Sequence, residues 1–151
     1  MRRSRLLMFA VLAATTVLLA GACSSSSASS SSGAGSASGS GKITIGTDQA
    51  NDHGTQDATG KSSFQIDANN DNGFYFNPTV LTGSANQSIT LEIKNVGTSE
   101  HNFSIDSQHV NVTMQPGGSE QVTVTFPASG TVEFYCSFHR SLGMVGELQV
   151  A

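Results

Sequence analysis

Positive charge is scarce in this sequence of 151 residues. Three of its seven Lys and Arg residues lie within the first five positions, which leaves four against eleven Asp and Glu, a net charge of −7, in the rest of the chain. Nucleic-acid binding needs a basic face that neutralises phosphate, so nucleic acid is excluded as a partner. If charge steers encounters, the sequence favours a positively charged protein partner; the alternative is that the charge serves solubility alone.

Cysteine is also rare, since the chain has only Cys23 and Cys136. An exported protein could join them in a disulfide. We expect no such bond, because the neighbouring residues give each cysteine a separate role. Cys23 follows an export-like segment, whereas Cys136 lies three residues before His139.

The first 41 residues have the composition of an export signal and a tether. Residues 1–22 combine a basic start with an apolar run too short to span a bilayer comfortably, which indicates an export signal. The small residues before Cys23 resemble a bacterial lipoprotein cleavage site; simple secretion and an uncleaved anchor are the alternatives. Residues 23–41 are then the lipidated cysteine and a flexible tether of Ser, Ala and Gly. The expected location is outside the cytoplasmic membrane, anchored to it by the lipid.

Helical periodicity is absent after Gly41, and apolar residues instead alternate with polar ones. The alternation is clearest in Ser88–Asn95, Gln121–Phe126 and Thr131–Cys136, and in the last of these it points Cys136 inward. Shorter strands are predicted at Lys42–Ile45, Ser63–Ile66, Phe74–Phe76, Asn102–Ile105, Val110–Met114 and Glu147–Val150. With the Gly and Pro turns between them, residues 42–151 are predicted to form an all-β Greek-key sandwich or barrel of about seven to eight strands.

Two stretches of this domain lack a clear pattern. Residues 46–61 are polar and without a usable period, so a loop is predicted after the first strand. His53 in this loop could belong to a second metal site, but no partner ligand can be named and a solvent-exposed histidine is the preferred interpretation. The consecutive residues Phe74, Tyr75 and Phe76 are interpreted as core residues, because no basic groove accompanies them.

The residues with the clearest chemistry lie near the C-terminus. Cys136, His139 and Met144 provide a thiolate, an imidazole and a thioether within nine residues, and His101 can supply a second imidazole from a neighbouring strand. This is the ligand set of trigonal blue-copper sites. Zinc would prefer a hard or thiolate fourth ligand, so the set predicts one copper ion. Each histidine alone could be a core or surface residue, and Met144 alone a core residue.

The sequence resembles the cupredoxins, especially the plastocyanin and amicyanin branch, over residues 62 to 151. The motif is His101-Asn102 followed by Tyr135-Cys136-Ser137-x-His139-x-x-x-Gly143-Met144-x-Gly146. This resemblance implies an electron carrier and not an enzyme. An open catalytic copper would need a further His beside Cys136, and a binuclear centre would need a second bridging Cys in the domain.

The resemblance also implies hydrogen bonds to the thiolate. The amide of Asn102 is expected to donate to Cys136. Phe138 occupies a position where plastocyanins commonly have proline, which has no amide hydrogen. Its amide is expected to be a second donor that tunes the site.

Further roles implied by the resemblance concern docking. The ring edge of His139 is the expected exit for electrons, and Phe138, Leu142 and Gly143 are expected to form an apolar docking patch around it. Tyr135 is expected to lead to a second, lateral docking surface.

The expected function is single-electron transfer by a monomer between redox partners such as a cytochrome or a membrane oxidoreductase. The alternative is a copper-binding lipoprotein that stores or delivers the ion. A metal-free adhesion or interaction module is disfavoured by the ligand set. Delivery requires copper exchange, whereas electron transfer requires retention, and four ligands including a buried thiolate favour retention.

Overall fold

The computed structural model describes residues 41–151. The predicted export signal, Cys23 and all of the tether before Gly41 lie outside the described residues. The described chain is almost entirely β-structure, with two short 3-10 helices, η1 (Asp106–Gln108) and η2 (Arg140–Leu142). No helix in this part of the chain is both long and apolar enough to cross a membrane. The predicted all-β class is confirmed.

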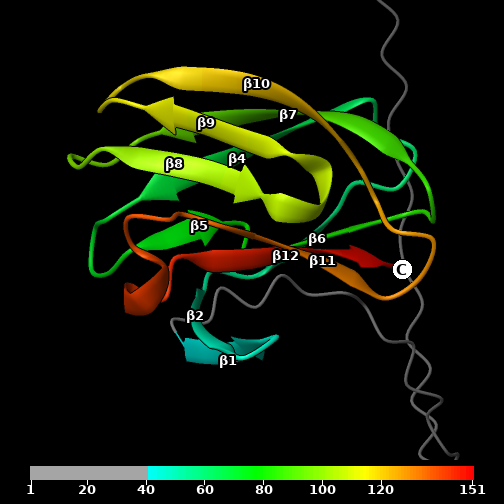
Figure 1. The fold of residues 1–151 in the computed structure, drawn as a ribbon, viewed down its shortest axis with the longest axis horizontal. Helices are drawn as coiled ribbons and strands as arrows, with labels where there is room; N and C mark the ends of the chain where they lie inside the picture. The colour runs from blue at the N-terminus through cyan, green and yellow to red at the C-terminus, as the bar shows by residue number, and fades with distance from the viewer. Residues whose placement is uncertain (1–40) are drawn as a thin grey trace, which may run out of the picture. The chain divides into compact units, whose positions relative to one another are not determined.

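Two sheets pack face to face in a sandwich (Figure 1). The first sheet has the order β10-β7-β4-β5, with bounds Ser119–Thr125, Ser88–Asn95, Ser63–Asn69 and Tyr75–Asn77. The second has the order β3-β6-β12-β11-β8-β9, with bounds Thr55–Asp57, Val80–Gly83, Val145–Val150, Thr131–Tyr135, His101–Ile105 and Val110–Met114. A separate hairpin consists of β1 (Gly41–Ile45) and β2 (Asp48–Asp52).

The core follows from the alternation of the long strands. Ile89, Leu91 and Ile93 of β7 are buried between the sheets, whereas the residues between them are partly accessible. Phe134 and Cys136 are fully buried on the opposing sheet, which confirms that the thiol points inward. The metal-ligand candidate is therefore attached to the rigid core of the sandwich.

The described residues contain twelve strands, more than the seven to eight predicted. The prediction of a loop over residues 46–61 was wrong, because this segment contains β2 and β3. A two-residue turn with Gly46 at φ 56° closes the β1–β2 hairpin, and β3 pairs with β6 in parallel. β3 is exposed at all three residues, so it has no apolar alternation that a sequence pattern could detect.

The preferred interpretation of His53 as solvent-exposed was also incorrect. Its ring is half-buried and stacks on Tyr75 with ring centroids 3.4 Å apart and planes 10° from parallel. Tyr75 and Phe76 are buried, as expected of core residues. Phe74 is only half-buried and lies at the candidate metal centre.

Candidate metal centre

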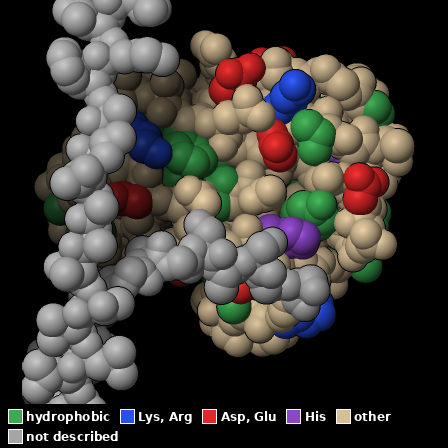
Figure 2. Space-filling view, turned by 180° about the vertical axis from the view of Figure 1, so that it is seen from behind, with side chains coloured by type: hydrophobic (Ala, Val, Ile, Leu, Met, Phe, Trp, Pro, Cys, Tyr) green, Lys and Arg blue, Asp and Glu red, His purple; other side chains and the backbone are tan. Residues whose placement is uncertain are grey.

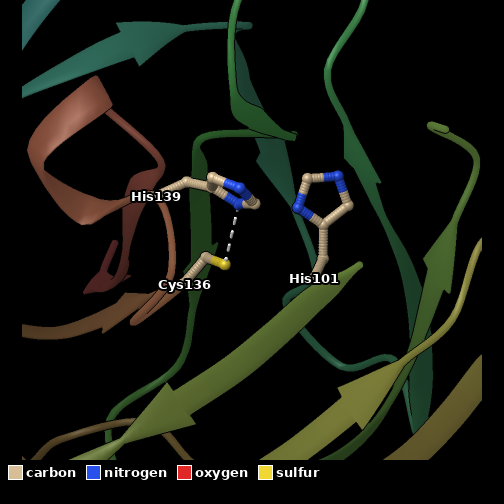
Figure 3. Close-up of side chains that lie close together, drawn as sticks. All are labelled: His101, Cys136 and His139. Atoms are coloured by element: carbon tan, nitrogen blue, oxygen red, sulfur yellow. Dashed lines mark hydrogen bonds between the residues drawn. The ribbon is translucent and has the colours of Figure 1, made fainter. Parts of the chain in front are cut away.

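Three strand ends and the loop between β11 and β12 supply the candidate ligands. His101 is the first residue of β8, and Cys136 directly follows β11, the antiparallel neighbour of β8. His139 precedes η2, and Met144 directly precedes β12. Because the β8 start and the β11 end meet at one end of the sandwich, residues 35 positions apart in sequence converge there (Figure 3).

Three of these side chains share one small space. The ligand atoms of His101, Cys136 and His139 all lie within 4.8 Å of one another. The Sγ atom of Cys136 is 3.4 Å from Nδ1 of His139, and the two imidazole rings have centroids 5.0 Å apart. His101 and Cys136 are fully buried, whereas His139 is half-buried. The arrangement presents one thiol and two imidazoles to a common point.

The hydrogen bonding and the pKa of His101 fit a metal ligand. Both of its ring nitrogens are buried without a hydrogen-bond partner, although buried polar atoms in proteins are nearly always hydrogen-bonded. Burial, together with the repulsion that a protonated His139 would add, lowers the pKa of His101 to about 4. Burial also lowers the pKa of His139. Both rings are therefore neutral at pH 7, which is the form that binds a metal.

Met144 lies beside these ligands in a tightly hydrogen-bonded loop. Its side chain is fully buried. Its amide donates to the carbonyl of His139 at 3.2 Å, and its carbonyl accepts from the amide of Cys136 at 3.0 Å. Gly143, at φ 96°, makes the turn before it in a conformation that favours glycine. The loop thus holds the thioether-bearing residue against both of the other loop ligands.

Asn102 connects β8 to the Cys136 loop, as the sequence indicated. Its amide donates to Sγ of Cys136 at 3.4 Å, and its side-chain oxygen accepts from the amide of Ser137 at 2.6 Å. Its side-chain nitrogen donates to Ser104 Oγ and Asn111 Oδ1, each at 3.0 Å. Within residues 41–151 no hydrogen bond joins the Phe138 amide to Sγ, so Asn102 is the backbone donor found here.

Phe74 belongs to the site, although its sequence context predicted a core residue. Its ring stacks on His139, with centroids 4.0 Å apart and planes 14° from parallel, and it meets His101 edge-on at 6.1 Å. It precedes β5, in the sheet opposite to the ligand loop. No spacing rule links Phe74 to the ligands, so the sequence carried no signal for this contact.

The expected docking residues differ in accessibility. Phe138 and Leu142 are 50% and 52% exposed, and they flank the half-buried His139. Gly143 is buried, because Asn51 of the hairpin covers it. A Cβ atom added at Gly143 would lie 2.8 Å from Nδ2 of Asn51. Gly143 therefore does not contribute to an exposed apolar patch, contrary to the expectation.

Tyr135 is surrounded by charged residues. Its hydroxyl donates to Asp106 at 2.7 Å, a hydrogen bond that raises the pKa of the phenol. The guanidinium of Arg140 lies 4.3 Å from the centre of the Tyr135 ring and is paired with Asp48 and Glu133. The surroundings of Tyr135 thus contain three carboxylates, Asp48, Asp106 and Glu133, and one cation, Arg140, which two of the carboxylates already pair.

The lowered pKa of His101 predicts a pH-dependent stability of the metal-free protein. Between its ordinary pKa of 6.5 and about 4, the unfolded chain binds a proton that the folded protein does not. The contribution of His101 to the free energy of unfolding is therefore fully present above pH 6.5. It is lost as the pH drops toward 4, at a cost of about 2–3 kcal/mol. Urea unfolding at pH 7 and pH 4.5 measures the loss. His101→Gln, which cannot titrate, should lose distinctly less; an equal loss in both proteins would contradict the assignment.

Comparison with known proteins finds relatives of one kind by family model, by sequence and by structure. A family model described as a cupredoxin-like domain matches residues 15–150. Plastocyanin A/B from Petroselinum crispum is 34% identical over 90 residues, which cover 53% of this chain and 91% of that protein. The structure of Na-dithionite reduced auracyanin from the photosynthetic bacterium Roseiflexus castenholzii matches with a TM-score of 0.51 and 25% identity, covering 60% of this chain and 98% of that chain.

These matches agree with the donor set of the site. A thiolate with two imidazoles is the equatorial set of blue-copper centres, and the orphaned nitrogens of His101 need a partner such as a metal. The family match covers most of the chain and includes all four ligand candidates. The chain therefore belongs to the cupredoxin family of blue copper proteins, and its His-Cys-His cluster is a site for one copper ion.

Proposed function

We propose that this protein is a membrane-tethered carrier of single electrons, and not an enzyme, that acts outside the cytoplasmic membrane. The observation that carries the proposal is the burial of His101 and Cys136 behind the partly accessible ring of His139. Buried ligands favour retention of the ion, and the half-buried ring offers one contact toward the surface. Copper bound at this site would supply a one-electron couple.

The protein residues keep the ligand positions fixed. Asn102 holds Sγ of Cys136 and the following backbone in place, and the loop bonds of Met144 tie it to Cys136 and His139. On this basis and on the sequence motif, we propose that Met144 would be the fourth residue to hold the ion, through its thioether. A site whose protein groups are held in this way needs little rearrangement between oxidation states, which favours rapid electron transfer.

We propose that partners dock over Phe138 and Leu142, at the end of the sandwich that carries the ligand loop. The ring of His139 then lies between the partner and the buried ligands. A second contact is proposed at Tyr135, beside an open hollow of about 320 Å³ that Asp106 and Glu133 help to line. In the face shown in Figure 2, the Lys and Arg side chains lie apart from one another and form no basic patch. The acidic surroundings of Tyr135 fit a basic redox partner such as a cytochrome, or a membrane oxidoreductase. We propose that the carrier acts as a monomer.

The tether and anchor are proposed from the sequence alone. The support is the export-like segment before Cys23 and the Ser, Ala and Gly composition after it. A Cys23→Ser protein should leave the membrane fraction. Its retention there, at the level of the parent, would contradict lipidation at this residue.

Electron-transfer kinetics test the carrier function. The reduced, copper-loaded protein should reduce a basic c-type cytochrome in a bimolecular reaction whose rate falls as salt screens the encounter. Leu142→Glu should slow this reaction about tenfold, because it places a charge in the apolar contact. Stopped-flow mixing over a range of ionic strengths measures both effects.

Gln121→Glu is the matched control, because it adds the same charge on the exposed side of β10, in the other sheet. Added negative charge alone should leave the rate unchanged or raise it. No electron transfer at any salt concentration would contradict the proposed function. Equal slowing by both variants would contradict docking over Leu142 and leave the carrier function intact.

A further inference from the structure

The β1–β2 hairpin lies far in sequence from the copper-ligand motif, yet it contacts the copper-ligand loop. In Figure 1 the hairpin lies beside the end of the sandwich where the chain turns from β11 into β12. Contacts between β2 and η2 join the two. The close approach of Gly143 to Asn51 and to the carbonyl of Gln49 occurs in this interface.

Asn51 of β2 makes most of the polar contacts in this interface. Its backbone amide donates to the carbonyl of Gly143 at 2.9 Å. Its side-chain nitrogen donates to the carbonyls of Leu142 at 2.9 Å and Phe74 at 2.7 Å. All three hydrogens on its nitrogens are thus used. Its side-chain oxygen accepts from Lys42 at 3.0 Å, which fixes the orientation of the amide.

The acceptors of these bonds belong to the two segments that flank His139. Leu142 and Gly143 connect His139 to Met144, and the amide of Leu142 donates to the His139 carbonyl at 2.9 Å. Phe74 stacks its ring on the His139 imidazole. One side-chain amide therefore joins the backbone that carries the ligand to the backbone that carries its stacking partner.

A second contact attaches the other end of η2 to the same strand. Asp48 of β2 accepts from Nε and a terminal nitrogen of Arg140 at 3.0 and 2.8 Å. Arg140 directly follows His139. The hairpin thus holds both ends of the short helix η2 between His139 and Met144. Asn51 is the hairpin residue that bonds both to the loop carrying His139 and to the backbone of Phe74.

We propose that Asn51 is a positioning residue of the copper site, and that the hairpin sets the geometry of His139 and its loop. The proposal goes beyond electron transfer, because it concerns how the loop is held whichever use is made of the copper. Without the Asn51 side-chain donors, the carbonyls of Leu142 and Phe74 lose a protein partner, and the loop opens more often.

Asn51→Asp tests this with almost no change in shape. A carboxylate has no hydrogen to donate and repels the carbonyls of Phe74 and Leu142. In the metal-free protein, hydrogen exchange of the Leu142 and Met144 amides, which both donate to the His139 carbonyl, should become at least roughly tenfold faster. In the copper-loaded protein, the electron paramagnetic resonance spectrum and the midpoint potential should change.

Gln49→Glu is the matched control, because it makes the same amide-to-carboxylate change in the same strand. The Gln49 side chain is exposed and donates to Thr44 of β1, and not to the loop carbonyls that Asn51 contacts. In Gln49→Glu, hydrogen exchange of the Leu142 and Met144 amides should match that of the parent protein. Any change in its midpoint potential measures the effect of the added charge alone. Protection of the β7 amides in each variant reports whether the sandwich is intact.

If Asn51→Asp fails to fold, Asn51→Ala removes the side-chain donors without adding charge, and the same exchange enhancement is expected. Parental exchange at Leu142 and Met144 in a folded variant, together with a spectrum and potential equal to those of Gln49→Glu, would overturn the proposal. Because the exchange measurement needs no copper and no redox partner, its outcome is independent of the proposed electron-carrier function.

Discussion

Cys136→Ala will abolish the intense visible band of the copper-loaded protein. The band requires charge transfer from a thiolate, and Cys136 is the free cysteine of the described domain, fully buried beside His101 and His139. Its removal leaves two imidazoles and a thioether, a set that cannot produce the band. Absorption spectra of both proteins, loaded with one equivalent of copper, measure the effect.

Met144→Leu serves as the companion variant, because it replaces a fully buried side chain with one of similar size. It should keep the coloured centre and raise the midpoint potential, since an axial thioether preferentially stabilises Cu(II). An unchanged visible band in Cys136→Ala would contradict the site assignment. An unchanged potential in Met144→Leu would contradict only the proposed role of Met144 as a ligand.

Gly146→Ala will destabilise the fold by about 3 kcal/mol or more, at the upper end of the cost of overpacking a core. Gly146 lies opposite Phe134 in the β11–β12 pair, and the ring covers it. An added Cβ would be 2.3 Å from the Phe134 ring and 2.5 Å from the carbonyl of Thr79. The ring cannot move aside readily, because it packs against Phe76 and Phe103 in the core.

Urea unfolding of the metal-free protein measures this loss. Gly41→Ala is the matched control, because a Cβ at Gly41 has no neighbour within 4 Å and its backbone is not in the left-handed region. It should change the free energy of unfolding by less than about 0.5 kcal/mol. A loss below about 1 kcal/mol for Gly146→Ala would contradict the packing described here.

The sequence predicted the ligand set because its chemistry is local. Cys136, His139 and Met144 are close in the chain, and an alternating strand fixed the inward direction of Cys136. The long strands β7 and β11 were predicted for the same reason, since half-buried strands alternate.

The surroundings of the ligands could not be predicted in this way. The stack of Phe74 on His139 and the burial of Gly143 beneath Asn51 depend on contacts between segments distant in sequence. The short, polar strands β2 and β3 are held by pairing and by side-chain hydrogen bonds, which leave no periodic pattern. The sequence therefore indicated the candidate ligands better than it indicated what holds them.

The measurement that tests the central claim most directly is a redox titration of copper-loaded residues 42–151, followed by challenge with a competing chelator. A one-electron carrier built on His101, Cys136, His139 and Met144 should show an intense visible band that bleaches and returns reversibly with a single-electron slope. It should also keep its copper against the chelator in both oxidation states. Absence of copper uptake, or ready loss of the ion to the chelator as expected of a copper-delivery protein, would contradict the account.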